Sequence, residues 1–332
     1  MINWVRLLIK CACLFARPLA FVAIVAPAVS GAQETYPVRP VRFVVPFPPS
    51  SPVDLLARVA AQKLTEPWGR PVVVENRTGA NGTIAVDQVS RATPDGYTLL
   101  FTPDFPIVIA PVLSKAPYDP RKDLTPIAAV AESMAMLVIN PSIGISSVEQ
   151  LIAAAKTKPG TLTFSSSGDA SPSRMCIELV KQEAGIDLVH VPYKGAPPAT
   201  QAVLAGEVSM FCGPIFQGLP HVKSGQLKAL GVTGAKPSSS FPELAPLSMQ
   251  GLPNVIVSYW YGVFAPVGMP PAILNKIRDS LKRVFDENDV REKLASAGLD
   301  PLWMDGTELA AAIRADLDKW TRVVKTAGIK SE

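Results

Sequence analysis

The chain has 332 residues, of which 48% are hydrophobic and 18% are charged, and a formal net charge of +4. This composition excludes a disordered chain, and the length exceeds what one compact core usually holds. Residues 1–32 hold three basic residues and no acidic one, so the charge falls to +1 without them. The remainder therefore gives no indication of a nucleic-acid partner.

The N-terminus has the pattern of an export signal. The basic residues Arg6 and Lys10 precede an apolar stretch over 11–29, and small residues follow at 30–32. This pattern predicts a signal peptide over 1–32 that is cleaved after export to the periplasm. The alternative is an uncleaved membrane anchor, which an arginine and a proline inside the apolar stretch disfavour.

Strands and helices are predicted to alternate along the first part of the mature chain. The predicted strands are 41–45, 71–75 and 97–102, and the predicted helices are 53–64 and 83–92. A glycine-rich turn, Gly79-Ala80-Asn81-Gly82, precedes the second helix and allows close backbone approach to a ligand. An ordinary turn before a helix explains it equally well. This rhythm is typical of a parallel α/β sheet.

The same alternation returns further along the chain. Strands are predicted at 135–139, 162–164, 188–191, 208–212, 229–232 and 255–264, and helices at 148–157, 172–184, 198–205, 271–286, 289–297 and 307–327. The strands near 135–139 and 255–264 would carry the chain out to a second lobe and back. We therefore expect an α/β fold with two lobes joined by a two-strand hinge. Residues 36–132 plus 258–332 would form one lobe and 133–257 the other.

Two cysteines, Cys176 and Cys212, remain after the signal. An oxidising compartment allows a disulfide between them. We favour two buried free thiols, because a chain of this length does not need a covalent staple.

A strand–turn–helix pattern with a Ser-Pro helix start occurs twice. Ser51-Pro52 opens the helix after 41–45, and Ser171-Pro172 opens the helix after 162–164. Serine at the N-cap followed by proline is a strong start signal, and such a start offers free N–H groups to an anion. Asp54 stands where a capping-box carboxylate would reach back. The plain alternative is two well-capped surface helices.

Catalytic signatures are absent from the sequence. It contains no G-x-S-x-G, Walker A or G-x-G-x-x-G motif, and no metal-ligand spacing. A triad of Ser166, His190 and Asp169 can be assembled on paper, but nothing local marks it. We therefore expect binding without catalysis, not an enzyme, with no cofactor and no metal.

At these loops the chain resembles a known family, the Bug-type solute-binding proteins of the tripartite tricarboxylate transporter system. The resemblance runs in order from about Tyr36 to the C-terminus. The residues that carry it include Pro46-Phe47-Pro48-Pro49, Asn76-Arg77, Pro94-Asp95-Gly96-Tyr97, Ser166-Ser167-Gly168, His190-Val191-Pro192-Tyr193-Lys194-Gly195 and Lys319-Trp320.

The resemblance implies a type II periplasmic binding protein fold that closes on a small organic acid. Family members hold a ligand carboxylate through the two helix-start loops, and the far end of the ligand meets residues near Thr102 and 211–214. The expected ligand-binding residues are Phe47, Ser50, Ser51, Asp54, Asn81, Thr102, Ser166, Gly168, Ser171, Phe211 and Pro214.

Two departures from the family pattern bear on specificity. Ser50-Ser51 stands where the family commonly has Gly-Gly, which adds hydroxyl donors and narrows the loop. Ser209 and Cys212 stand where the family often has acidic residues. Losing an acid near the ligand disfavours an ammonium group, so we favour a plain mono- or dicarboxylate over an amino acid.

The leading hypothesis is a monomeric periplasmic protein that captures a small carboxylate and delivers it, through transient contact, to membrane subunits of a tripartite tricarboxylate-type transporter. One alternative is a ligand-binding protein that serves a sensor kinase. Another, from a different class, is a secreted hydrolase with Ser166 as its nucleophile.

Overall fold

The computed structural model describes residues 36–169, 171–239 and 241–329, so the expected signal peptide lies outside the described residues. The strands are β1 (Val41–Val45), β2 (Val72–Asn76), β3 (Thr98–Pro103), β4 (Leu124–Ile139), β5 (Thr163–Ser166), β6 (Val189–Pro192), β7 (Met210–Pro214), β8 (Lys228–Val232), β9 (Ser258–Pro266) and β10 (Asp300–Asp305).

The α-helices are α1 (Pro52–Trp68), α2 (Thr83–Ser90), α3 (Phe105–Val108), α4 (Ala110–Leu113), α5 (Val148–Thr157), α6 (Pro172–Ala184), α7 (Ala196–Leu204), α8 (Ile215–Lys223), α9 (Pro271–Asp286), α10 (Asn288–Ser296) and α11 (Gly306–Thr326).

These strands form one mixed sheet in the order β2-β1-β3-β9-β4-β7-β5-β6, with β8 and β10 also paired to β4. The pairings of β1 with β2 and β3 are parallel, as are those of β5 with β6 and β7. Every pairing of β4 and β9 is antiparallel. Two parallel α/β units are therefore joined through antiparallel strands.

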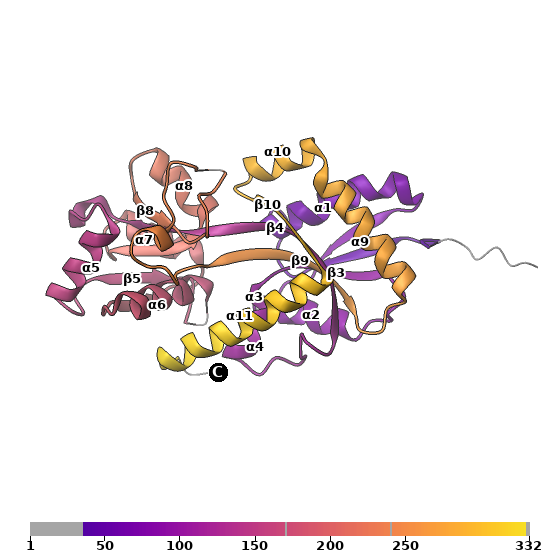
Figure 1. Ribbon diagram of the computed structural model, residues 1–332, viewed down its shortest axis with the longest axis horizontal. Coiled ribbons are helices and arrows are strands. Elements are labelled where there is room, and N and C mark those ends of the chain that lie inside the picture. Colours follow the sequence, from indigo (N-terminus) through magenta and orange to yellow (C-terminus); the bar gives the residue numbers. More distant parts are fainter. Residues whose placement is uncertain (1–35, 170, 240, 330–332) are drawn as a thin grey trace, which may run out of the picture. The chain divides into compact units, whose positions relative to one another are not determined.

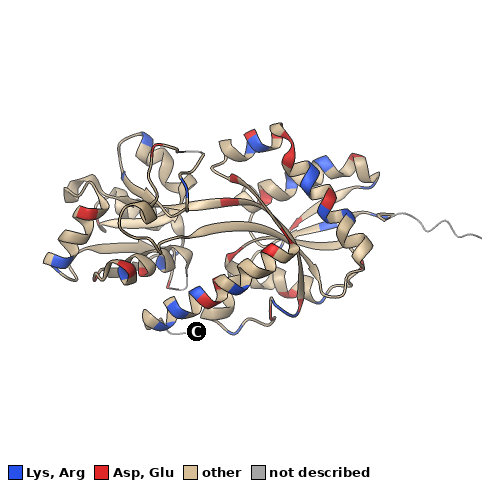
Figure 2. Ribbon diagram, viewed as in Figure 1, with Lys and Arg blue, Asp and Glu red and all other residues tan. Residues whose placement is uncertain are grey.

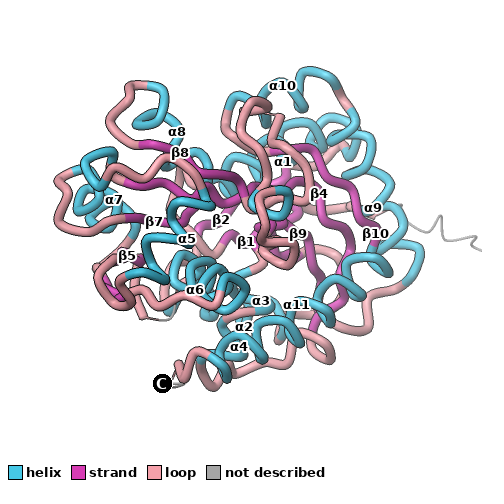
Figure 3. The backbone as a smooth tube through the Cα atoms, turned by 60° about the vertical axis from the view of Figure 1, so that its left-hand side comes forward, coloured by secondary structure: helices cyan, strands magenta, loops and turns pink. Residues whose placement is uncertain are grey.

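The long strand β4 belongs to both units. Its part from Leu124 to Met134 pairs with β9, and its part from Ala135 to Ile139 pairs with β7 and β8. Figure 1 shows β4 and β9 running side by side from the group of α1 and α9 towards the group of α5 to α8, and Figure 3 shows the same course from another side. Charged side chains concentrate on the helices and turns, whereas β4 and β9 carry few (Figure 2).

Helices cover the sheet through three apolar clusters. Helices α1 and α9 pack around Phe43 and Phe101 of β1 and β3, and α7 and α8 cover β7 around Phe211. Helix α11 buries Trp320 and reaches α6, where Gln182 Nε2 donates to the carbonyl of Val323 at 3.1 Å. Apolar burial at these faces is the main favourable term that holds the elements together.

Several elements differ from the sequence predictions. The sequence predicts only helices after residue 271, which is wrong, because β10 lies between α10 and α11 and pairs antiparallel with β4. The strand expected at 135–139 is the end of the much longer β4. Helix α8 was not predicted as a helix because Pro220 lies inside it, and α1 likewise continues past Pro67 to Trp68.

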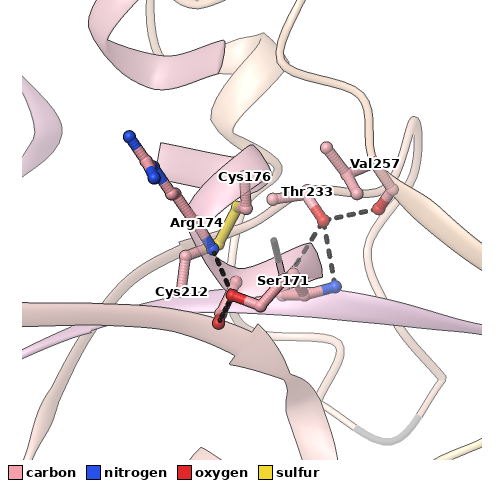
Figure 4. The surroundings of a disulfide bond; sticks show 8 residues. Ser171, Arg174, Cys176, Cys212, Thr233 and Val257 are labelled. Carbon is pink, nitrogen blue, oxygen red and sulfur yellow. Dashed lines mark hydrogen bonds between the residues drawn. A yellow bond between two sulfur atoms is a disulfide. The ribbon is translucent and has the colours of Figure 1, made fainter. Parts of the chain in front are cut away.

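Cys176 and Cys212 form a disulfide between α6 and β7, so the expectation of free thiols is wrong (Figure 4). Their Cα atoms are 6.1 Å apart and both side chains are fully buried. Chain length decides whether a bond is needed for stability. Packing decides whether it forms, and here α6 lies directly on β7.

Candidate ligand-binding cavity

A cavity of about 510 Å³ opens between the end of β3, the start of β9 and the starts of α6 and α7. This volume lies within the range of small-molecule sites. The lining residues are Phe47, Asn81, Pro103, Asp104, Phe105, Ser167, Gly168, Asp169, Ser171, Pro172, Ser173, Gly195, Ala196, Phe211, Pro214, Gln217, Tyr259 and Tyr261.

The loop between β1 and α1 is held by the buried carboxylate of Asp54. It accepts hydrogen bonds from the Ser50 N–H at 2.9 Å, Arg58 Nε at 2.8 Å and Asn76 Nδ2 at 2.8 Å. Burial alone would raise the pKa of Asp54, but these donors outweigh it and hold the pKa below its usual range. Asn76 Nδ2 also donates to the carbonyl of Phe47, which places Phe47 at the cavity.

The predicted cap of α1 is only partly present. Ser51 occupies the N-cap position, but its hydroxyl donates to the carbonyl of Pro48 and caps no N–H group. Asp54 reaches back to the N–H of Ser50, not of Ser51, so the expected capping box is displaced by one residue. Ser50 has φ +67°, the left-handed region that favours glycine. That backbone explains why a glycine suits this position.

The start of α6 presents a cluster of hydroxyls to the cavity. Ser171 caps the helix, since its Oγ accepts from the N–H of Arg174 at 3.4 Å, and it donates to the carbonyl of Gly168. Ser173 Oγ accepts from the N–H of Ser167 at 2.9 Å and lies 3.1 Å from the hydroxyls of Ser167 and Ser171. Hydroxyls and first-turn N–H groups at the positive end of a helix dipole suit an anion.

A second helix start, that of α7, meets the same cavity. Gly195 is its N-cap and contributes no side-chain cap, and Gly195 and Ala196 both line the cavity. Gly195 has φ +107°, so a side chain there would be strained. The starts of α6 and α7 therefore converge on one wall.

The structure brings together Ser166, His190 and Asp169, the three residues of the triad that the sequence allows. Ser166 Oγ lies 2.6 Å from His190 Nε2, and His190 Nδ1 lies 3.6 Å from Asp169 Oδ1. Burial lowers the pKa of His190 to about 4, with Arg174 acting in the same direction and Asp169 opposing. The Ser166 side chain is fully buried and does not line the cavity, so a substrate carbonyl has no access to its hydroxyl.

The wall opposite α6 carries an acid. Asp104 follows β3 directly and is 2% exposed. Burial raises the pKa of its carboxyl well above the usual range, Asp316 adds to this and Lys319 opposes it. Tyr259 and Tyr261 of β9 line the cavity beside it, and burial raises the pKa of each, with Asp104 contributing.

The expected binding residues fall into two groups. Those that line the cavity are Phe47, Asn81, Gly168, Ser171, Phe211 and Pro214. Those that do not line it are Ser50, Ser51, Asp54, Thr102 and Ser166. Thr102 is fully buried within β3, where its hydroxyl donates to the carbonyl of Pro103. The first loop therefore meets the cavity through an aromatic ring and not through its serines.

Sequence reasoning missed Asp104, Gln217, Tyr259 and Tyr261. Asp104 comes at the carboxyl end of a predicted strand, which is where ligands bind in such sheets. The tyrosines alternate about Trp260 in β9, and this period of two places both on one face. Both signals were present in the sequence.

A family model described as the tripartite tricarboxylate transporter family receptor, TctC, matches residues 56–329. The chain belongs to this receptor family. It is 32% identical over 312 residues to protein BugT of Bordetella pertussis, covering 93% of this chain and 96% of BugT. The resemblance seen in the loop residues is thus confirmed.

Similar solved structures share the fold. Rpa4515 of R. palustris, solved with adipate, has a TM-score of 0.77 and 29% identity, covering 89% of this chain and 99% of its own. MatC from Rhodopseudomonas palustris, with bound malate, has a TM-score of 0.72 and 29% identity, and the match covers 87% of this chain and 100% of the MatC chain. The α/β fold with two lobes, that of a type II periplasmic binding protein, is confirmed.

A membrane-spanning helix and a metal site were both sought within the described ranges. No helix there is long and apolar enough to cross a membrane. No group of three or more His, Cys, Asp or Glu side chains within the same ranges is arranged to hold a metal ion.

Proposed function

We propose that this receptor is exported to the periplasm, binds a small organic acid in the cavity, and delivers it as a monomer to a tripartite tricarboxylate-type transporter without catalysing a reaction. The observation that carries the proposal is the convergence of two helix starts and a hydroxyl cluster on one cavity. The family membership and the acids bound by Rpa4515 and MatC support a carboxylate as the ligand.

The ligand carboxylate would lie against the start of α6. Ser173 supplies a hydroxyl there, whereas the single hydroxyl hydrogen of Ser171 is taken by the carbonyl of Gly168, and Asn81 approaches from the turn before α2. A carboxylate that accepts several such donors is bound without a formal cation nearby. Ser50, Ser51 and Asp54 would then act indirectly, by fixing the loop that carries Phe47.

Closure on the ligand would bend the chain near residues 133 and 257, where it passes between the expected lobes 36–132 plus 258–332 and 133–257. Thr233 lies beside Val257 at this position (Figure 4). Its hydroxyl accepts from the N–H of Ala135 at 2.9 Å and donates to the carbonyl of Val257 at 2.6 Å. A ligand that contacts both walls would favour the closed form through its differential affinity.

A thermal-shift screen of organic acids against their primary amides tests the proposal. An acid at 100 times its dissociation constant should stabilise the protein by about 2.7 kcal/mol and its amide should not. A shift of about 5 °C follows for a chain of this size. No shift with any acid, together with a shift from a neutral compound, would overturn it.

Variants at the α6 start sharpen the screen. Ser173→Ala removes a hydroxyl from the cluster and should weaken acid binding about fivefold, as expected for about 1 kcal/mol. The matched control is Ser296→Ala, which should bind acids as the unaltered protein does. Ser296 is an exposed serine of α10, and its hydroxyl donates to the backbone carbonyl of Lys293.

A further inference from the structure

We propose that Asp104 selects, among small carboxylates, those that also carry an ammonium group, so that the ligand spans the cavity from the α6 start to Asp104. This inference rests on the proposed function. It names the second group of the ligand, which family membership leaves open.

Asp104 is a buried acid without a charged partner in the described chain. Its own N–H donates to the carbonyl of Trp260 at 2.9 Å, which fixes the residue at the end of β3 beside β9. Asp104 lines the cavity, and its carboxyl meets backbone N–H groups of Asp104 and Phe105 but makes no ion pair with any residue in the described ranges, since the nearby Lys319 pairs with Asp316. A buried, unpaired carboxyl is costly, and the raised pKa of Asp104 reflects that cost.

The rest of the lining offers no positive side chain. Among the described residues around the cavity there is no lysine, arginine or histidine. The other acid in the lining, Asp169, already pairs with Arg174 at 3.1 Å. An ionised Asp104 would repel a second carboxylate on the ligand, with no cation between them, whereas an ammonium group would favour the ionised form of Asp104 and meet its complement.

Two further acceptors in the lining lack partners. The hydroxyl of Tyr259 and Oε1 of Gln217 are buried atoms without a hydrogen bond. An ammonium group has three N–H donors, and Asp104 and these two atoms are acceptors of the kind it needs. The rings of Tyr259 and Tyr261 add faces that attract a cation.

The two sides of the cavity therefore differ in electrostatic character: helix starts that suit an anion lie on the α6 side, and an acid lies on the β3–β9 side. The sequence disfavours an ammonium group because Ser209 and Cys212 stand where an acid could pair with it. Neither residue lines the cavity, and Cys212 is in the disulfide. The acid that matters lies at Asp104.

The test is calorimetric titration at pH 7 with three probes of matched length: 6-aminohexanoate, adipate and hexanoate. A second set uses 4-aminobutanoate, succinate and butanoate. We expect the amino acid to bind at least tenfold more tightly than the other two members of at least one set. Asp104→Asn should abolish that preference and leave the affinity for the plain alkanoate within a factor of two.

Asp318→Asn, at an exposed acid of α11, is the matched control and should keep the preference. Tyr259→Phe should weaken amino-acid binding about threefold and keeps the test usable if Asp104→Asn does not fold. Tighter binding of the dicarboxylates, or a preference that survives in Asp104→Asn, would overturn the inference while the proposed function stands. Failure of all six probes to bind would overturn the inference, and the proposed function falls only if the thermal-shift screen also finds no acid that binds.

Discussion

The disulfide between Cys176 and Cys212 should contribute substantially to stability and to the site. The two cysteines are separated by 36 positions in the sequence, and the bond closes the loop between them. For a loop of that length the chain-entropy model gives about 4 kcal/mol. The double variant Cys176→Ala, Cys212→Ala should therefore unfold about 8 °C lower. Its urea midpoint should fall and its slope should rise, because the unfolded chain without the cross-link is less compact and exposes more surface.

The same bond ties together two walls of the cavity. Cys176 lies in the first turns of α6 after Ser173, and Cys212 follows Phe211 in β7. Reduction should therefore weaken carboxylate binding as well as lower stability. The assay compares oxidised protein, reduced protein and the double variant, with reductant added to the double variant as the control. Two titratable thiols in the oxidised protein, or a loss below about 1 kcal/mol, would refute the reasoning.

Three further predictions concern single side chains. Asp54→Asn should lower the free energy of unfolding in urea by about 2 kcal/mol and weaken acid binding, because the donors around residue 54 lose their carboxylate. The control, Asp87→Asn, breaks a surface ion pair with Arg91 and should cost less than about 1 kcal/mol. Since burial lowers the pKa of His190 to about 4, the unfolded chain takes up a proton first as the pH falls below 6.5. The contribution of His190 to stability should fall by about 2 kcal/mol between pH 7 and 5, so stability should decline more over this range in the unaltered protein than in His190→Gln. Asp104, whose raised pKa acts in the opposite direction, is present in both proteins and cancels in the comparison. His221→Gln is the control for the chemical change, and an unchanged slope in His190→Gln would contradict the assignment. Ester hydrolysis by the purified protein should be unaffected by Ser166→Ala; activity lost in that variant would instead favour the hydrolase.

Local signals predicted some elements correctly because those elements are decided locally. Helices α5 and α6 begin where serines cap them, and Ser147 and Ser171 do accept from N–H groups of the first turn. Helix α11 begins at Gly306, after the N-cap residue Asp305, which forms a complete capping box with Glu308. In each case the deciding contacts span three residues, so the sequence contains them directly.

The long strand and the cavity depend on contacts between distant segments. The first part of β4 contains Pro126 and Glu132 and has no clean alternation, yet it is a strand because β9 and β10 flank it on both sides. The wall of Asp104 and Tyr261 exists because β3 pairs with β9. Pairing of segments so far apart in the chain is not encoded in any local pattern.

The central claim is that the cavity holds a small acid by its carboxylate. A crystal structure of the protein with the acid that gives the largest thermal shift tests this most directly. The account predicts a carboxylate hydrogen-bonded to Ser173 and the first turn of α6, with the remainder of the ligand between Phe47 and Phe211. A ligand bound outside this cavity, or one whose carboxylate points away from α6 into solvent, would contradict it.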